Sequence, residues 1–90
     1  MAGRADDWQL VQRVQGGDKT AFDVLVLKYQ HKIVKLVMRY VQDPSESQDV
    51  AQEVCIRLVE RVASFRGDSR FSTWLYQLAL NACRDHMRRQ

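Results

Sequence analysis

The chain has 90 residues, of which 46% are hydrophobic and 28% are charged, and its formal net charge is +3. This composition is typical of one small globular domain and excludes a disordered chain. The apolar runs are too short for a membrane span, the N-terminus lacks the apolar segment of a signal peptide, and two cysteines cannot form a disulfide framework, so a reduced, cytoplasmic protein without membrane insertion is expected.

Two helices are predicted in the first half of the chain. The first, over residues 7–16, begins after Asp6 with Gln9 as its capping partner and ends at Gly16 and Gly17. The second, over residues 18–41, has two neighbouring apolar stripes, which predicts contacts on two of its sides. The first stripe comprises Phe22, Leu25, Val26, Tyr29, Ile33, Leu36, Val37 and Tyr40, and the second comprises Val24, Leu27, Val34, Met38 and Val41.

The second helix leaves only a narrow row of basic side chains for solvent. Like charges three or four residues apart repel each other and weaken a helix slightly. Their presence favours a nearby phosphate backbone, and an ordinary solvated face is the alternative. The row consists of Lys28, Lys32, Lys35 and Arg39.

Two further helices are predicted over residues 46–62 and 70–88. Ser45 and Gln48 form a possible capping box for the third helix, and either Asp68 or Ser69 can cap the fourth. Four helices without any strand pattern predict an all-α, compact four-helix bundle. The third helix has a buried stripe of Val50, Ala51, Val54, Cys55, Leu58, Val59 and Val62.

The opposite side of the third helix carries an apolar side chain among acidic and polar ones. Such a patch resembles a small docking site for a basic protein surface. A single exposed isoleucine is also ordinary, so the pattern alone does not decide between these interpretations. The row consists of Asp49, Gln52, Glu53, Ile56 and Glu60.

A polar loop, Phe65, Arg66, Gly67, Asp68 and Ser69, leads into the fourth helix. Its glycine permits positive φ or close approach of a ligand, and its polar groups could bind an extruded base. The alternative is a plain connection in which the aspartate only caps the helix.

The fourth helix combines an aromatic ring near its start with amides and guanidinium groups further along. Trp74 falls on the core stripe, whereas Tyr76 lies off it and could stack on a base. The polar row beside it suits base edges or phosphates, with a solvated face as the alternative. This row comprises Thr73, Gln77, Asn81, Arg84 and Arg88.

Catalytic and metal-binding patterns are weak in this sequence. Cys83 and His86 lie one helical turn apart, but even with His31 or Cys55 nearby they lack the spacing of a four-ligand zinc site. We find no glycine-rich phosphate loop and no nucleophile with a plausible base. Neither an enzyme, a metal site nor a cofactor is expected.

Four segments, in order, resemble region 2 of the extracytoplasmic-function sigma factors of bacterial RNA polymerase, most closely the envelope-stress branch. They are GDKTAF at 17–22, YQHK at 29–32, DVAQE at 49–53, and FRGDSRFSTWLY at 65–76 followed by Asn81. The resemblance covers nearly the whole chain. It implies a single region 2 domain over residues 1–90, without the linker and C-terminal helix-turn-helix of such factors.

The resemblance also implies a function. Region 2 docks on the β′ clamp helices of RNA polymerase core and captures the single non-template strand of the promoter −10 element as the duplex opens. An anti-sigma factor is a further expected partner. By position, Asp49, Gln52, Glu53 and Ile56 would bind polymerase; residues 65–69, Tyr76, Asn81, Arg84 and Arg88 would bind DNA; and Lys28, Lys32, Lys35 and Arg39 match only the family's general basic character.

Two residues depart from the family pattern. Cys55 replaces a larger apolar residue, and Ser72 stands where close relatives often have tyrosine, so promoter preference could differ. Two alternatives remain: a sigma-like decoy or interaction module that binds a regulator and not promoter DNA, and a generic binder of phosphate backbones. The presence of Arg66, Tyr76 and Asn81 favours DNA over the decoy.

Overall fold

The computed structural model describes residues 2–89, with side chains described from Asp7 onward. It confirms the predicted all-α fold: within the described range there are four helices and no strand. The elements are α1 (Ala2–Gln15), α2 (Lys19–Tyr40), α3 (Pro44–Arg61), the short 3₁₀ helix η1 (Val62–Ser64) and α4 (Phe71–Arg88). None of these helices is both long enough and apolar enough to cross a membrane.

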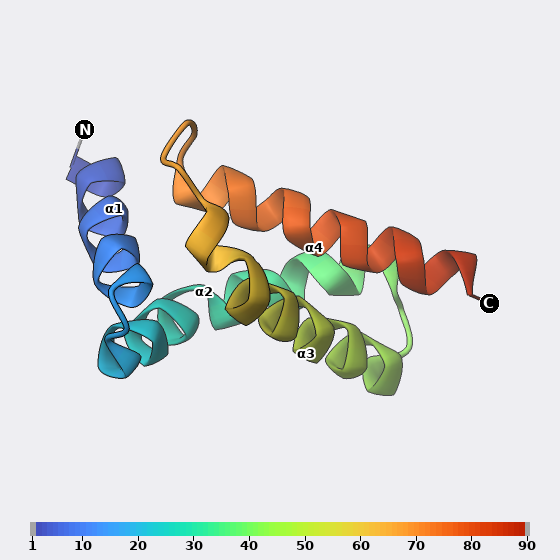
Figure 1. The fold of residues 1–90 in the computed structure, drawn as a ribbon. Coiled ribbons are helices and arrows are strands. Elements are labelled where there is room, and N and C mark those ends of the chain that lie inside the picture. Colours follow the sequence, from blue (N-terminus) through green and yellow to red (C-terminus); the bar gives the residue numbers. More distant parts are fainter. Residues whose placement is uncertain (1, 90) are drawn as a thin grey trace.

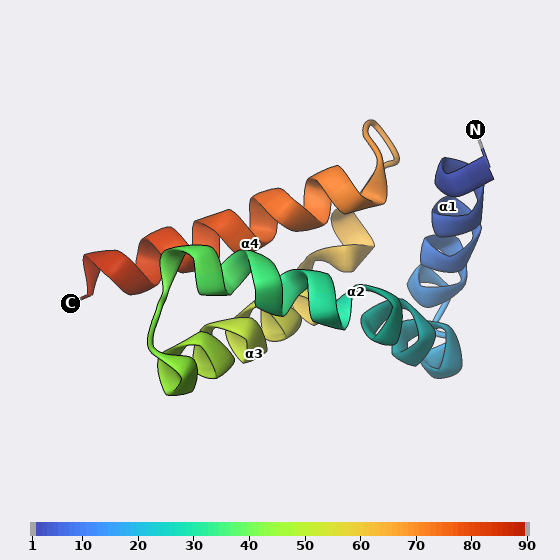
Figure 2. The same ribbon diagram turned by 180° about the vertical axis from the view of Figure 1, so that it is seen from behind.

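Helix α2 is the centre of the molecule and contacts all three other helices. Helix α1 lies at one end, against the first half of α2, whereas α3 and α4 flank its second half (Figures 1 and 2). The loop between η1 and α4 projects on the side of α4 that is nearer to α1 (Figure 1). This arrangement brings the predicted DNA-binding loop close to the N-terminal helix.

The core confirms the first apolar stripe of α2 and corrects the second. Leu25, Tyr29 and Ile33 are buried as predicted. In the second stripe, however, Val24, Leu27 and Met38 are exposed, as are Tyr40 of the first stripe and Val59 of α3. Periodicity identifies the apolar faces of a helix, but it does not say whether another element covers each face. The second stripe is therefore only partly buried, through Val34 and Val41, whereas the predicted contacts of α2 on more than one side are confirmed.

Helix α1 begins earlier than predicted, whereas its predicted end at Gly16 and Gly17 is confirmed. It begins at Ala2 and not after Asp6. The capping role predicted for Asp6 lies outside the described side chains. At the other end, Asp18 N–H donates to Arg13 O at 3.0 Å while Gly17 adopts a φ of +97°. This is a glycine-terminated helix end of the Schellman type.

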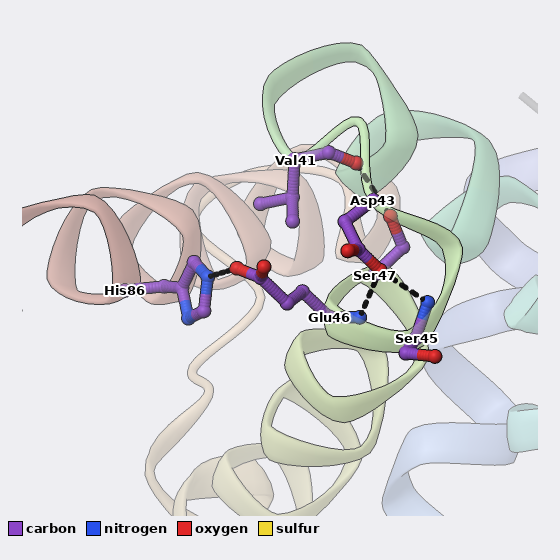
Figure 3. Close-up of polar contacts among 6 residues, drawn as sticks. All are labelled: Val41, Asp43, Ser45, Glu46, Ser47 and His86. Atoms are coloured by element: carbon purple, nitrogen blue, oxygen red, sulfur yellow. Dashed lines mark hydrogen bonds and ion pairs between the residues drawn. The ribbon is translucent and has the colours of Figure 1, made fainter. Parts of the chain in front are cut away.

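Helix α3 begins two residues earlier than predicted and has a different cap (Figure 3). Asp43 Oδ1 accepts from Ser45 N–H at 2.8 Å and from Glu46 N–H at 3.3 Å. Pro44 occupies the first helical turn, where its missing N–H costs nothing. The predicted capping box at Ser45 was wrong, because an aspartate directly before a proline already supplies the acceptor.

The junction between α2 and α3 is fastened by a buried hydroxyl. Ser47 Oγ donates to Val41 O at the end of α2, at 2.5 Å. Nearby, His86 Nε2 of α4 lies 2.8 Å from Glu46 Oε1, and Figure 3 shows that the two side chains point toward each other. The start of α3 is thereby tied to both α2 and α4.

Candidate nucleic-acid interface

The predicted DNA-binding loop is anchored in the core by its first residue. Phe65 is only 6% exposed, and its ring centroid lies 5.8 Å from that of Trp8, 5.6 Å from Phe71 and 5.2 Å from Trp74. Its ring therefore contributes to the position of the loop and is withdrawn from solvent. The periodic core stripes did not include it, because a loop residue has no helical register.

Beyond Phe65 the loop turns back through Gly67, whose φ of +80° lies in the left-handed region. Arg66, Asp68 and Ser69 on either side of this glycine are exposed. The structure thus brings together three polar side chains at the tip of a short turn that is anchored below by aromatic rings.

The start of α4 lacks the cap that the sequence predicted. Among the described residues, no side chain caps this helix, and its N-cap position is Arg70. Ser69 Oγ donates instead to the Arg70 carbonyl at 3.2 Å. The prediction that Asp68 or Ser69 caps α4 was wrong, because the extended Arg70 separates them from the first turn. The first-turn N–H groups therefore lie beside the loop tip without a side-chain acceptor.

The polar row of α4 lies on the outside, as predicted. Asn81, Arg84 and Arg88 are exposed, and Tyr76 is partly buried near the loop end of the helix. Their helical spacing places Asn81, Arg84 and Arg88 on one side of α4, with Tyr76 on the flank of the helix between this side and the core. The charge on this side is positive, and a strand held there would meet the loop first and the arginines afterwards.

The basic row of α2 begins with a residue that already has an anionic partner. Lys28 Nζ lies 2.6 Å from Asp7 Oδ1, and the Tyr29 hydroxyl donates to the other carboxylate oxygen at 2.5 Å. Burial, followed by the hydrogen bond to Asp7, raises the pKa of Tyr29. Lys32 Nζ lies 5.6 Å from the centroid of the Tyr29 ring.

The predicted polymerase-binding row lies along α3. Asp49, Gln52 and Ile56 are exposed, which confirms that the isoleucine lies off the core, and Glu53 is partly buried. Sequence reasoning missed Arg57, whose Nε donates to Glu53 Oε2 at 3.1 Å and whose Nη2 donates to Asp85 Oδ2 at 2.8 Å. The spacing of four residues between Glu53 and Arg57 was the available signal.

An open apolar groove lies beside Ile56, between α2 and α3. It encloses about 520 Å³ and is lined by Phe22, Asp23, Val26, Leu27, Cys55, Ile56 and Val59. Of the side chains that were wrongly predicted to be buried, Leu27 and Val59 line this groove. The exposed apolar area around Ile56 is therefore larger than the single isoleucine that the sequence indicated.

The residues that were considered as metal ligands, Cys83 and His86, make other contacts in the structure. Cys83 is buried in the core, where burial raises the pKa of its thiol, and His86 pairs with Glu46. Within the described part of the chain, no three His, Cys, Asp or Glu side chains gather closely enough to hold a metal ion.

Comparison with known proteins identifies the fold and the region. The family described as Sigma-70 region 2 matches residues 25–90. The RNA polymerase sigma-H factor of Pseudomonas aeruginosa is 55% identical over 87 residues, which are 97% of this chain and 45% of that protein. The ECF RNA polymerase sigma-E factor of Escherichia coli K12 is 46% identical, with the same coverage of both chains.

A solved structure provides the spatial comparison. It is the NMR structure of the complex formed by an engineered region 2 of sigmaE with GTAAAA. It matches with a TM-score of 0.86 and 44% sequence identity, over 93% of this chain and 87% of that one. This chain spans about half the length of the curated relatives it matches. It belongs to the Sigma-70 region 2 family.

Proposed function

We propose that this chain recognises the −10 element of bacterial promoters as a single strand and docks on RNA polymerase core. One observation carries the proposal: the match, over nearly the whole chain, to an engineered sigmaE region 2 whose structure was solved with the oligonucleotide GTAAAA. The exposed loop tip and the basic side of α4 are adjacent in this chain, and together they suit an extruded base and the strand that follows it.

In this proposal, each part of the interface has a separate task. Arg66, Asp68, Ser69 and the uncapped start of α4 offer hydrogen-bonding groups to an extruded base. Tyr76 offers a ring for stacking, which returns roughly 1–3 kcal/mol per base. The remaining contacts, to base edges and phosphates, come from Asn81, Arg84 and Arg88.

The function needs no catalytic residue, because binding of the unpaired strand itself favours the open duplex. We therefore propose a binding domain and not an enzyme. Lys28, Lys32, Lys35 and Arg39 would add only general attraction for phosphates, and Lys28 least of all because it already pairs with Asp7.

We further propose that the exposed row of α3 binds the polymerase clamp. Asp49, Gln52, Glu53 and Ile56 present acidic and amide groups around an apolar centre. This combination fits a basic helical surface with an apolar contact. An anti-sigma factor is a second expected protein partner. Because RNA polymerase acts in the cytoplasm, binding to it would also locate this chain there.

The test separates the two surfaces with one substitution on each. Asn81→Ala should weaken binding to labelled GTAAAA by about tenfold, since a lost polar base contact is worth 1–3 kcal/mol. Gln52→Ala should leave DNA affinity unchanged and weaken binding to polymerase core. Fluorescence anisotropy at fixed salt measures the first, and co-migration with polymerase on a sizing column measures the second.

Single-base variants of GTAAAA complete the experiment. A sharp loss of affinity at one position supports readout of a base in the pocket. Equal affinity for all variants, combined with a steep dependence on salt, would instead identify a generic phosphate binder. A chain that binds none of them but still binds a protein regulator would be a decoy module.

A further inference from the structure

Side chains of helix α1 contact the predicted DNA-binding loop and the backbone just before it. Gln15 Nε2 donates to Val62 O at 2.9 Å and to Phe65 O at 2.8 Å, which fixes the backbone at the first residue of η1 and at the first residue of the loop. The Trp8 ring meets the Phe65 ring edge-on, with an interplanar angle of 70°. Both residues therefore connect α1 to the entry of the loop.

The same tryptophan also lies against the turn of the loop. A Cβ added at Gly67 would lie 2.9, 3.0 and 3.2 Å from three atoms of the Trp8 ring. Contacts this close mean that the indole rests directly on the glycine backbone. The position therefore requires glycine for two reasons, its φ of +80° and the ring beside it.

Helix α1 is itself firmly seated at the point from which Trp8 projects. The adjacent Asp7 is buried and accepts hydrogen bonds from Tyr29 and Lys28 of α2. Two residues in sequence thus tie α1 to α2 on one side and to the loop on the other. The family match begins at residue 25, so it includes none of α1.

We propose that Trp8 and Gln15 are positioning residues, through which α1 holds the 65–70 loop in the shape that reads a base. The proposal rests on the function proposed above, because it concerns the same loop. Neither side chain needs to touch DNA. Their effect is on the choice of base, since a loop that samples several shapes offers no single pocket.

The first test compares Trp8→Ala with Trp8→Phe. We expect Trp8→Ala to reduce the affinity ratio between GTAAAA and its worst single-base variant by about tenfold, and Trp8→Phe to keep most of that ratio. Anisotropy titrations are made at a temperature at which circular dichroism shows every variant to be folded. General destabilisation would not change this ratio in a folded population.

The second test uses the hydrogen bonds of Gln15. Gln15→Glu keeps the shape of the side chain but replaces the donor with an acceptor that faces two carbonyl oxygens. Gln12→Glu is the matched control, because it adds the same charge to an exposed position of the same helix. Gln15→Glu should lower the base preference, whereas Gln12→Glu should lower only the overall affinity.

A double-mutant cycle isolates the contact between the indole and the glycine. Gly67→Ala should lower base preference and thermal stability more than Gly17→Ala, which has a similar φ of +97° but nothing within 4 Å of the added Cβ. In the Trp8→Ala background the two glycine substitutions should have similar effects on stability. Additive effects of Trp8→Ala and Gly67→Ala would contradict the proposal.

The outcomes also distinguish this proposal from the function on which it rests. A parent chain that binds all single-base variants equally would overturn the proposed function and the positioning role together. A parent with a clear preference that Trp8→Ala and Gln15→Glu both leave intact would overturn the positioning role alone. Loss of preference in both variants, with recovery in Trp8→Phe, supports it.

Discussion

At the scale of single residues, carboxylates with nearby donors connect the helices. The backbone N–H of Ala21, and then the Arg13 guanidinium, hold the pKa of Asp18 below its usual value of 3.8. Arg57 does the same for Asp85, by a hydrogen bond that joins α3 to α4. Each pair thus favours the ionised carboxylate in the folded chain.

These lowered pKa values predict a loss of stability in acid. A carboxyl with a lower pKa in the folded chain stabilises it above the unfolded pKa and stops doing so as the pH falls through the folded pKa. The melting temperature should therefore fall as the pH is lowered from about 5 to about 2, and Asp85→Asn should show less of that fall. Differential scanning calorimetry across this range measures it.

The partner of Asp85 provides a second variant for the same experiment. Arg57→Gln removes the guanidinium and its charge, so it should reduce the acid dependence by as much as Asp85→Asn does, and the double variant should add little more. Acid dependence equal to that of the parent in both single variants would contradict the assignment.

Contacts between side chains of different helices were the part of the structure that the sequence predicted least well. The stripe that includes Leu25 and Ile33 follows from helical spacing alone, and the structure confirms it. The pair of Asp7 and Tyr29 joins two different helices, so no local pattern indicates it. Phe65 was likewise grouped with the polar loop, because the aromatic rings that surround it belong to other elements, α1 and α4.

At the scale of elements, the helix ends decide where the chain turns. Asp43 caps α3, and Ser47 fastens the same end of α3 to the last turn of α2. Two candidate caps, Asp43 and Ser45, lie within three residues of each other, and sequence alone does not choose between them. The existence of all four helices was predicted correctly, whereas the caps of α3 and α4 were not.

The cap assignment gives a direct comparison of two substitutions. Asp43→Ala should lower the free energy of unfolding by about 1 kcal/mol, because two N–H groups of the first turn lose their acceptor. Ser45→Ala should change it by less than about 0.5 kcal/mol, since that side chain is exposed. Urea unfolding followed by circular dichroism measures both. A larger loss of stability in Ser45→Ala than in Asp43→Ala would contradict this cap and support the capping box predicted from the sequence.

At the scale of the whole molecule, one continuous core links all four helices. Val11 of α1, Leu25 of α2, Val54 of α3 and Leu75 of α4 all belong to it. The exposed groove between α2 and α3 lies at the edge of this core, although most of its lining side chains are also apolar. Composition therefore predicts the amount of apolar surface, and only the packing of helices shows which part is covered.

Two leucines of α2 test this division. Leu25 is 0% exposed and Leu27 is 69% exposed, so Leu25→Ala should cost about 3 kcal/mol and Leu27→Ala less than about 0.5 kcal/mol. Both substitutions replace leucine with alanine in α2, so the difference between their effects on the free energy of unfolding reports the difference in burial. Urea unfolding measures it, and equal effects would show that the groove is covered in solution.

The two phenylalanines that frame the loop, Phe65 and Phe71, have their ring centroids 5.6 Å apart. Only residues 66–70 lie between them, and four of these five side chains are exposed. Substitutions at Arg66, Asp68 or Ser69 can therefore change the polar surface of the tip without disturbing the aromatic frame beneath. If the tip reads a promoter base as proposed, natural selection can change the base preference at these positions without loss of folding, while Gly67 stays fixed by the indole that rests on it.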